Sequence, residues 1–274
     1  MKYNRFSLKK ALSNIIAESF LYEEIDYLVK SLNEITTRHK NINNIDSYKE
    51  AVKEIISFLK ENGFVILGRG ATRVVFHRAQ DSYVIKVSDV LHKGLHTPNK
   101  SEIEVSTGVH GIDAIDIVPK TIEYDKVYSE NSIWLITEKV QILSLMHQGD
   151  IEKLFPTVAK IYKNYIMDDI SINIEDILVR LIQYCKQSKF YMMSTKEFLR
   201  LFSYVAYNVG NKEDVDIEYL RSVVVTHDCP DILRLLRCMK YIQTNDLHAG
   251  NIGATLGSEV GPEHFVILDF DYGV

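Results

Sequence analysis

The spacing of apolar residues predicts that the chain begins with helices. Across residues 1–62, apolar side chains recur three and four positions apart, as in helices with one buried face. Ser7 is the expected N-cap of a first helix, and Asp46 or Ser47 that of a later one. Gly63 predicts the end of that later helix. The apolar positions are Leu8, Leu12, Ile15, Ile16, Leu21, Ile25, Leu28, Val29, Leu32, Val52, Ile55, Ile56 and Leu59.

After Gly63 the pattern changes to short runs that are typical of β-strands. Glycine-containing or polar turns separate the first three runs, which predicts a small antiparallel meander. A short helix is expected over residues 100–108, before two further strands. The five predicted strands cover residues 64–67, 73–78, 83–87, 120–124 and 133–140.

The second half of the chain is expected to be mainly helical. Apolar residues at helical spacing continue from residue 150 to residue 242. Two strands are expected to follow, over residues 252–255 and 265–270, joined by the turn residues Gly257, Gly261 and Pro262. The fold class is therefore expected to be α+β.

Composition and charge narrow the function only a little. The 274 residues carry a formal net charge of -5, which does not favour a nucleic-acid partner or an anionic membrane. We find no apolar run near the roughly 20 residues of a membrane span. The three cysteines form no close pair, which fits reduced thiols and a cytoplasmic location.

A glycine-rich turn and a lysine mark the predicted meander. Gly68 and Gly70 interrupt it where backbone N–H groups can approach phosphate oxygens, although a tight hairpin turn would also explain them. Lys86 lies between apolar residues on a predicted strand, where it can point into a cleft towards phosphates. The simpler alternative is an edge-strand lysine that faces water.

Two acidic segments lie near the predicted C-terminal strands. Asp246 and Asn251 are five residues apart on a loop, where the first can accept a hydroxyl proton and the second can bind Mg²⁺. Asp269 follows three apolar residues at a strand end, where it can hold Mg²⁺ that bridges nucleotide phosphates. An Asx-rich turn and a solvent-exposed chain end are the alternatives.

In their order along the chain, these four segments resemble the protein kinase-like superfamily. The loop Asp246-Leu247-His248-Ala249-Gly250-Asn251 is similar to the DLHxGN loop of aminoglycoside and choline kinases. The resemblance implies a bilobal fold that binds ATP and Mg²⁺ between its lobes. It also implies a helical extension over residues 1–62, an N-lobe with hinge over 63–140 and a helical C-lobe over 141–274.

The resemblance assigns phosphate contacts to Gly68, Gly70 and Lys86. It also implies a helix glutamate that holds Lys86. Glu102 and Glu104 are two positions apart, about 200° around a helix, so only one of them faces inward, and Glu104 is preferred.

The same resemblance places adenine against backbone groups of Glu138 and Val140, in the expected hinge. Only five residues follow Asp269, so no activation segment is expected.

The expected function is transfer of the ATP γ-phosphate to a hydroxyl, with Asp246 as base. The chain resembles small kinase-like proteins of bacteriophages, which favours Ser or Thr of a host protein as the acceptor. The catalytic loop instead favours a small molecule of the aminoglycoside or choline type. A non-catalytic pseudokinase and nucleotidyl transfer are further alternatives, and the oligomeric state is left open.

Overall fold

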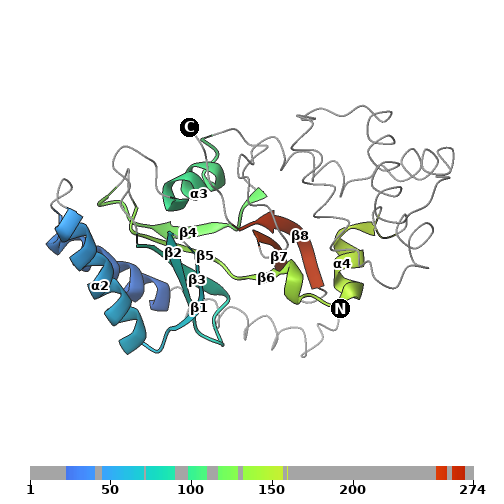
Figure 1. Ribbon diagram of the computed structural model, residues 1–274, viewed down its shortest axis with the longest axis horizontal. Coiled ribbons are helices and arrows are strands. Elements are labelled where there is room, and N and C mark those ends of the chain that lie inside the picture. The colour runs from blue at the N-terminus through green and yellow to red at the C-terminus, as the bar shows by residue number, and fades with distance from the viewer. Residues whose placement is uncertain are drawn as a thin grey trace, which may run out of the picture. The chain divides into compact units, whose positions relative to one another are not determined.

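The protein combines helices with two antiparallel β-sheets, as the α+β expectation requires (Figure 1). The computed structural model describes residues 23–40, 45–70, 72–89, 98–109, 117–128, 132–156, 159, 251–257 and 261–268. The first predicted helix, from Ser7, lies outside these residues. So does nearly all of the helical region that was predicted over residues 150–242.

Two helices precede the first sheet. Residues 23–38 form one helix, and α2 (Ile45–Glu61) forms the other. Their buried side chains recur at helical spacing, as the sequence predicts: Ile25, Leu28, Leu32, Ile35, Tyr48, Val52, Ile55 and Leu59. Gly63 ends α2 with φ of +80°, and the amide of Phe64 donates to the carbonyl of Leu59 at 3.0 Å.

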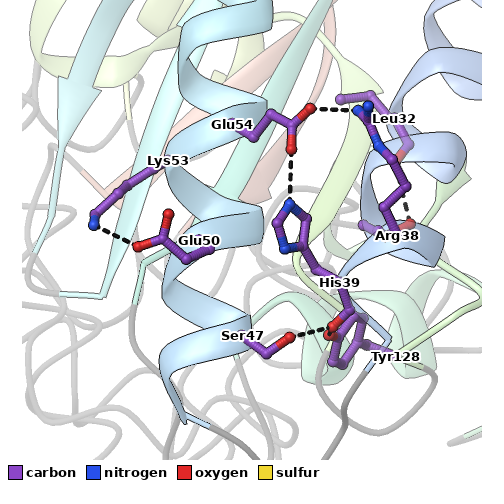
Figure 2. A network of polar contacts seen from close by, with 9 residues as sticks. Leu32, Arg38, His39, Ser47, Glu50, Lys53, Glu54 and Tyr128 are labelled. Atoms are coloured by element: carbon purple, nitrogen blue, oxygen red, sulfur yellow. Dashed lines mark hydrogen bonds and ion pairs between the residues drawn. The ribbon is translucent and has the colours of Figure 1, made fainter.

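A polar network joins the end of the first helix to α2 (Figure 2). Glu54 of α2 forms an ion pair with Arg38, and its second carboxylate oxygen, Oε2, lies 2.7 Å from Nε2 of His39. The hydroxyl of Ser47 donates to the carbonyl of His39 at 2.6 Å, and Tyr128 donates to the same oxygen. Because α2 begins at Ile45, Ser47 is inside the helix, and the prediction that Asp46 or Ser47 is the N-cap is wrong.

The larger sheet has five strands in the order β1-β2-β3-β5-β4. The antiparallel meander that the sequence predicts is confirmed in its first three strands, and the predicted helix over 100–108 appears as α3 (Pro98–Ser106). The strands are β1 (Val65–Arg69), β2 (Arg73–His77), β3 (Tyr83–Ser88), β4 (Thr121–Tyr124) and β5 (Trp134–Glu138). The buried hydroxyl of Tyr48 donates to the carbonyl of Ser88 at 3.0 Å, which ties α2 to the end of β3.

The loop between β4 and β5 is organised by a buried carboxylate. Asp125 is fully buried and accepts hydrogen bonds from the amides of Val127 at 2.8 Å, Tyr128 at 3.3 Å and Ile133 at 3.0 Å. Burial raises the pKa of Asp125, and the three backbone donors act in the opposite direction.

This carboxylate is expected to make the protein less stable as the pH rises. A raised pKa in the folded state means that folding favours the protonated form. The contribution of Asp125 to the free energy of unfolding is therefore largest below its ordinary pKa of 3.8. It is lost as the pH rises through the pKa of Asp125 in the folded protein. Urea unfolding should show the free energy of unfolding of the wild type falling relative to that of Asp125→Asn above about pH 4. A difference that stays constant with pH would contradict this assignment.

The smaller sheet has three strands in the order β6-β7-β8. These are β6 (Val140–Ile142), β7 (Ile252–Gly257) and β8 (Gly261–Ile267), with a short 3-10 helix η2 (Leu143–Leu145) and helix α4 (Gln148–Leu154) after β6. The rings of Phe155 and Phe265 stack with centroids 4.7 Å apart. Gly261 and Pro262 belong to β8 rather than to a turn, and Pro262 is tolerated because β8 is an edge strand.

The chain divides into two compact units. One holds the helices before Gly63 with β1, β2 and β3, and the other holds β6, β7, β8 and α4. The predicted part boundaries at residues 62 and 140 stay predictions. In the part of the chain that the structure describes, no helix is both long and apolar enough to cross a membrane.

Candidate functional site

The glycine-rich segment lies on the edge strand β1 and its turn into β2. Gly68 faces Val75, and Arg69 faces Val74. The register shifts between Ile66 and Gly68, so the strand has an irregularity immediately before the glycines. The amide of Gly70 donates to the carbonyl of Arg73 at 2.9 Å and closes the turn.

Neither glycine in this segment is required by the packing of the chain. A Cβ at Gly68 would meet no atom within 4 Å, and one at Gly70 would meet only the carbonyl oxygen of Arg73 at 3.9 Å. The positive-φ glycines among the described residues are Gly63 and Gly108, so the backbone of Gly68 and Gly70 does not need glycine either. A strand glycine in open space is what a closely approaching ligand requires.

Lys86 lies on the central strand of the five-stranded sheet. All six residues of β3 are buried, and the side chain of Lys86 is only 5% exposed. The alternative of an edge-strand lysine that faces water is therefore excluded. Because a desolvated ammonium needs compensation, a lysine here is costly unless it serves a charge-binding role or is paired.

The strand register places Lys86 and Gly68 at the same level of the sheet. Lys86 faces Val75 in β3–β2 pairing, and Val75 faces Gly68 in β2–β1 pairing. Residues directly opposite each other share one face, and adjacent strands are about 4.8 Å apart, so this row spans about 10 Å. We call these three residues the Gly68–Val75–Lys86 row. Sequence reasoning missed Val75 as a member, since only the register reveals it.

The opposite face of the same strands forms the core. Val74 pairs with Val87 and Phe76 with Ile85, and all four side chains are fully buried. The turn after Gly70 is tied to the end of β3, where the amide of Asp89 donates to the carbonyl of Thr72 at 3.1 Å. The Gly68–Val75–Lys86 row is therefore held on a rigid scaffold.

The two candidate glutamates on α3 differ in burial. Glu102 is completely buried, whereas Glu104 is half-buried. Both residues take part in polar or electrostatic interactions. A buried carboxylate is normally paired with a positive charge, so burial makes Glu102 the stronger candidate for the partner of Lys86. The spacing along the sequence instead favours Glu104.

The predicted hinge connects the two sheets through one residue. β5 ends at Glu138, and β6 begins at Val140. The amide of Glu138 donates to the carbonyl of Lys120 at 3.0 Å, and that of Lys139 donates to Ser82 at 2.7 Å. Recognition of a base here would therefore need the carbonyl of Glu138 or the backbone of Val140.

Asn251 lies directly before β7, half-buried. Its carbonyl accepts a hydrogen bond from the amide of Leu268 at 2.9 Å. Leu268 is the residue before Asp269 in the sequence, so the β7–β8 hairpin brings the chain around Asn251 next to the residue that precedes the second predicted metal ligand. Asp246 and Asp269 themselves lie outside the described residues.

Gly253 in β7 contrasts with the open glycines. A Cβ there would lie 2.9 Å from Cγ2 of Val140 and 3.3 Å from both the carbonyl oxygen of Gln141 and Cδ1 of Leu268. Gly253→Ala is therefore expected to lower the free energy of unfolding by about 1–3 kcal/mol through overpacking. Urea unfolding tests this. Gly68→Ala is the matched control, because the new Cβ would meet no atom within 4 Å and should change the free energy of unfolding by less than about 0.5 kcal/mol. Equal effects of the two substitutions would contradict the assignment.

Comparison with known proteins yields no match to any protein-family model and no curated relative. Among the described residues, no group of three His, Cys, Asp or Glu side chains could hold a metal ion.

Proposed function

We propose that this protein is an Mg²⁺- and ATP-dependent phosphotransferase with a bilobal, kinase-like fold. The observation that carries the proposal is the Gly68–Val75–Lys86 row, in which a nearly fully buried lysine on a central strand lies level with a glycine that packing does not require. The phosphates of a nucleoside triphosphate need these two features: a backbone that they can approach closely and a cation held in a fixed position.

Under this proposal, residues on the described strands bind phosphates. Backbone N–H groups of the segment around Gly68 donate to phosphate oxygens, while the amide of Gly70 closes the turn onto Arg73. Lys86 neutralises the α- and β-phosphates. The adenine contacts backbone groups of Glu138 and Val140.

The chemical step would use three residues near the C-terminal strands. Asp246 accepts the proton of the acceptor hydroxyl, whose oxygen attacks the γ-phosphorus while the bond to the ADP oxygen breaks. Asn251 and Asp269 are the proposed ligands of Mg²⁺, which supplies charge neutralisation on the β- and γ-phosphates when bound. The hydrogen bond between Asn251 and Leu268 supports placing these two ligands at one end of the hairpin.

The proposed acceptor is the hydroxyl of a Ser or Thr in a protein. The resemblance of the chain to small kinase-like proteins of bacteriophages favours a protein of the host cell. A small-molecule hydroxyl is the alternative that the Asp246 to Asn251 loop favours. Cytoplasmic action fits both acceptors. Labelling of a lysate distinguishes the two acceptors, because labelled proteins give bands on a gel, whereas labelled small molecules are separated by chromatography.

Two substitutions on α3 are expected to identify the partner of Lys86. The account predicts that only one of Glu102→Gln and Glu104→Gln lowers phosphoryl transfer, by about 10-fold or more, since the two side chains point about 200° apart. The complete burial of Glu102 favours Glu102→Gln. Initial rates with labelled ATP measure the effect, and each variant serves as the control for the other. If both variants transfer phosphate at the wild-type rate, neither Glu102 nor Glu104 takes part in the mechanism.

Nucleotide binding tests the proposal most simply. Mg·ATP should raise the midpoint of thermal unfolding of the wild type, because a ligand that binds only the folded state stabilises it. Gly68→Val keeps the fold, since its site is open, but should remove most of the ATP-dependent shift, because the side chain occupies the space of the phosphates. A shift with ATP and no transfer would make the protein a nucleotide-binding module instead. The absence of any shift would overturn the proposal.

A further inference from the structure

One peptide group at the end of β3 is bonded both to helix α2 and to the glycine-rich turn. Ser88 is the last residue of β3, and its carbonyl accepts a hydrogen bond from the hydroxyl of Tyr48 on α2 at 3.0 Å. The amide of Asp89, which belongs to the same peptide group, donates to the carbonyl of Thr72 in the turn at 3.1 Å. The hydroxyl of Tyr48 therefore begins a chain of two hydrogen bonds that ends at the turn.

The same peptide group is close to both parts of the proposed phosphate site. Arg69, in the glycine-rich segment, forms an ion pair with Asp89 at 3.8 Å. Lys86 lies two residues before Ser88 on β3, so the two side chains are on one face of the sheet. A shift of the Ser88–Asp89 peptide group therefore moves the glycine-rich turn and the end of β3 that carries Lys86.

The hydroxyl of Tyr48 is the part of this side chain that packing does not require. Tyr48 is 1% exposed, and its ring lies edge-on to that of Tyr128, with centroids 6.0 Å apart. A phenylalanine ring would fill the same space. Burial raises the pKa of Tyr48, so the hydroxyl stays protonated at neutral pH and donates to Ser88.

We infer that Tyr48 is a positioning residue of the proposed phosphate site, acting through the Ser88–Asp89 peptide group on the glycine-rich turn and Lys86. The inference rests on the proposed function, which assigns these elements to the phosphates of ATP. Hydrogen bonds in a chain polarise one another, so the bond from Tyr48 strengthens the bond to Thr72. The peptide plane is rigid and fixes the direction of both bonds. Because the adenine is assigned to the predicted hinge, Tyr48 affects the binding of phosphates and not that of adenosine.

Tyr48→Phe tests this inference, because it removes the hydroxyl and keeps the ring. Calorimetric titration of the full-length protein gives the dissociation constants for Mg·ATP and for adenosine. The variant should bind Mg·ATP about threefold to tenfold more weakly than the wild type, as expected for the loss of one hydrogen bond. It should bind adenosine as the wild type does. A variant that is only less stable would lose affinity for both ligands by the same factor.

Tyr128→Phe is the matched control for this substitution. Tyr128 is also buried, and its hydroxyl also donates to a backbone carbonyl, but to that of His39 at the end of the first helix (Figure 2). Both dissociation constants of this variant should equal those of the wild type. If Tyr48→Phe binds Mg·ATP as tightly as Tyr128→Phe, the inference is overturned and the proposed function stands. No binding of Mg·ATP by the folded wild type would overturn both.

Hydrogen exchange of the wild type covers the case in which Tyr48→Phe fails to fold. Coupling between two sites is reciprocal, so bound phosphates should strengthen the contact of Tyr48 with β3. The amides over residues 49–55 of α2, a helix with no proposed phosphate contact, should therefore exchange about threefold to tenfold more slowly with Mg·ATP than with adenosine. Equal exchange with the two ligands, both at saturation, would overturn the inference.

Discussion

Replacing Asp246 by asparagine is expected to lower the rate of phosphoryl transfer from ATP by about 10²–10⁴-fold. Asparagine has the size of aspartate but cannot accept the proton of the acceptor hydroxyl. Binding of Mg·ATP should stay within about threefold of the wild type, because in the proposed mechanism Asp246 acts on the acceptor and not on the nucleotide. Initial rates with γ-labelled ATP, together with a binding titration, separate the two effects.

The matched control for this substitution is Asp150→Asn. Asp150 lies on α4 and forms an ion pair with Lys153 at 3.0 Å, an exposed pair of the kind that contributes little. This variant should transfer phosphate at the wild-type rate. An Asp246→Asn variant that is as active as Asp150→Asn would remove Asp246 from the reaction.

Replacing Lys86 by methionine is expected to lower phosphoryl transfer by about 10²–10³-fold and to weaken Mg·ATP binding. Methionine keeps an unbranched stem at this buried position but removes the ammonium that would neutralise the phosphates. Both quantities are measured on protein whose unfolding midpoint in urea is determined in parallel.

Lys53→Met is the control for the loss of a lysine. Lys53 is exposed on α2, outside the Gly68–Val75–Lys86 row, and pairs with Glu50 at 2.7 Å. It should bind and transfer as the wild type does. If Lys86 only supported folding, Lys86→Met would unfold more easily yet keep full transfer per folded molecule.

The sequence predicted the local structure well where one short pattern decides it. The runs over residues 64–67, 73–78 and 83–87 became β1, β2 and β3, because turn residues bound each of them. Gly63 ended α2 as expected, since the left-handed conformation at that position favours glycine.

The prediction was less accurate where distant partners decide the structure. The predicted strand over 133–140 is divided at Lys139, whose amide donates to Ser82, while Val140 pairs with Thr255 in the other sheet. The apolar pattern runs through both parts, so periodicity could not reveal the division. Gly261 and Pro262 read as turn residues, but β8 extends through them because its outer edge needs no proline N–H.

For the candidate site, the sequence supplied residue types and order but not their positions. It could not distinguish an edge lysine from a central one, because strand order depends on how β5 joins the meander next to β3. It also could not distinguish Gly68, which is open, from Gly253, which is crowded, since both are glycines near predicted strands.

The most direct measurement of the central claim is transfer of label from γ-labelled ATP by the full-length wild type with Mg²⁺, alone and in a cell lysate. The account predicts label on an acceptor that depends on Mg²⁺ and is lost in Asp246→Asn and Asp269→Asn. Label on protein bands would identify a protein acceptor, and label on small molecules alone would identify the other class. No transfer and no binding of Mg·ATP by the folded wild type would contradict the account.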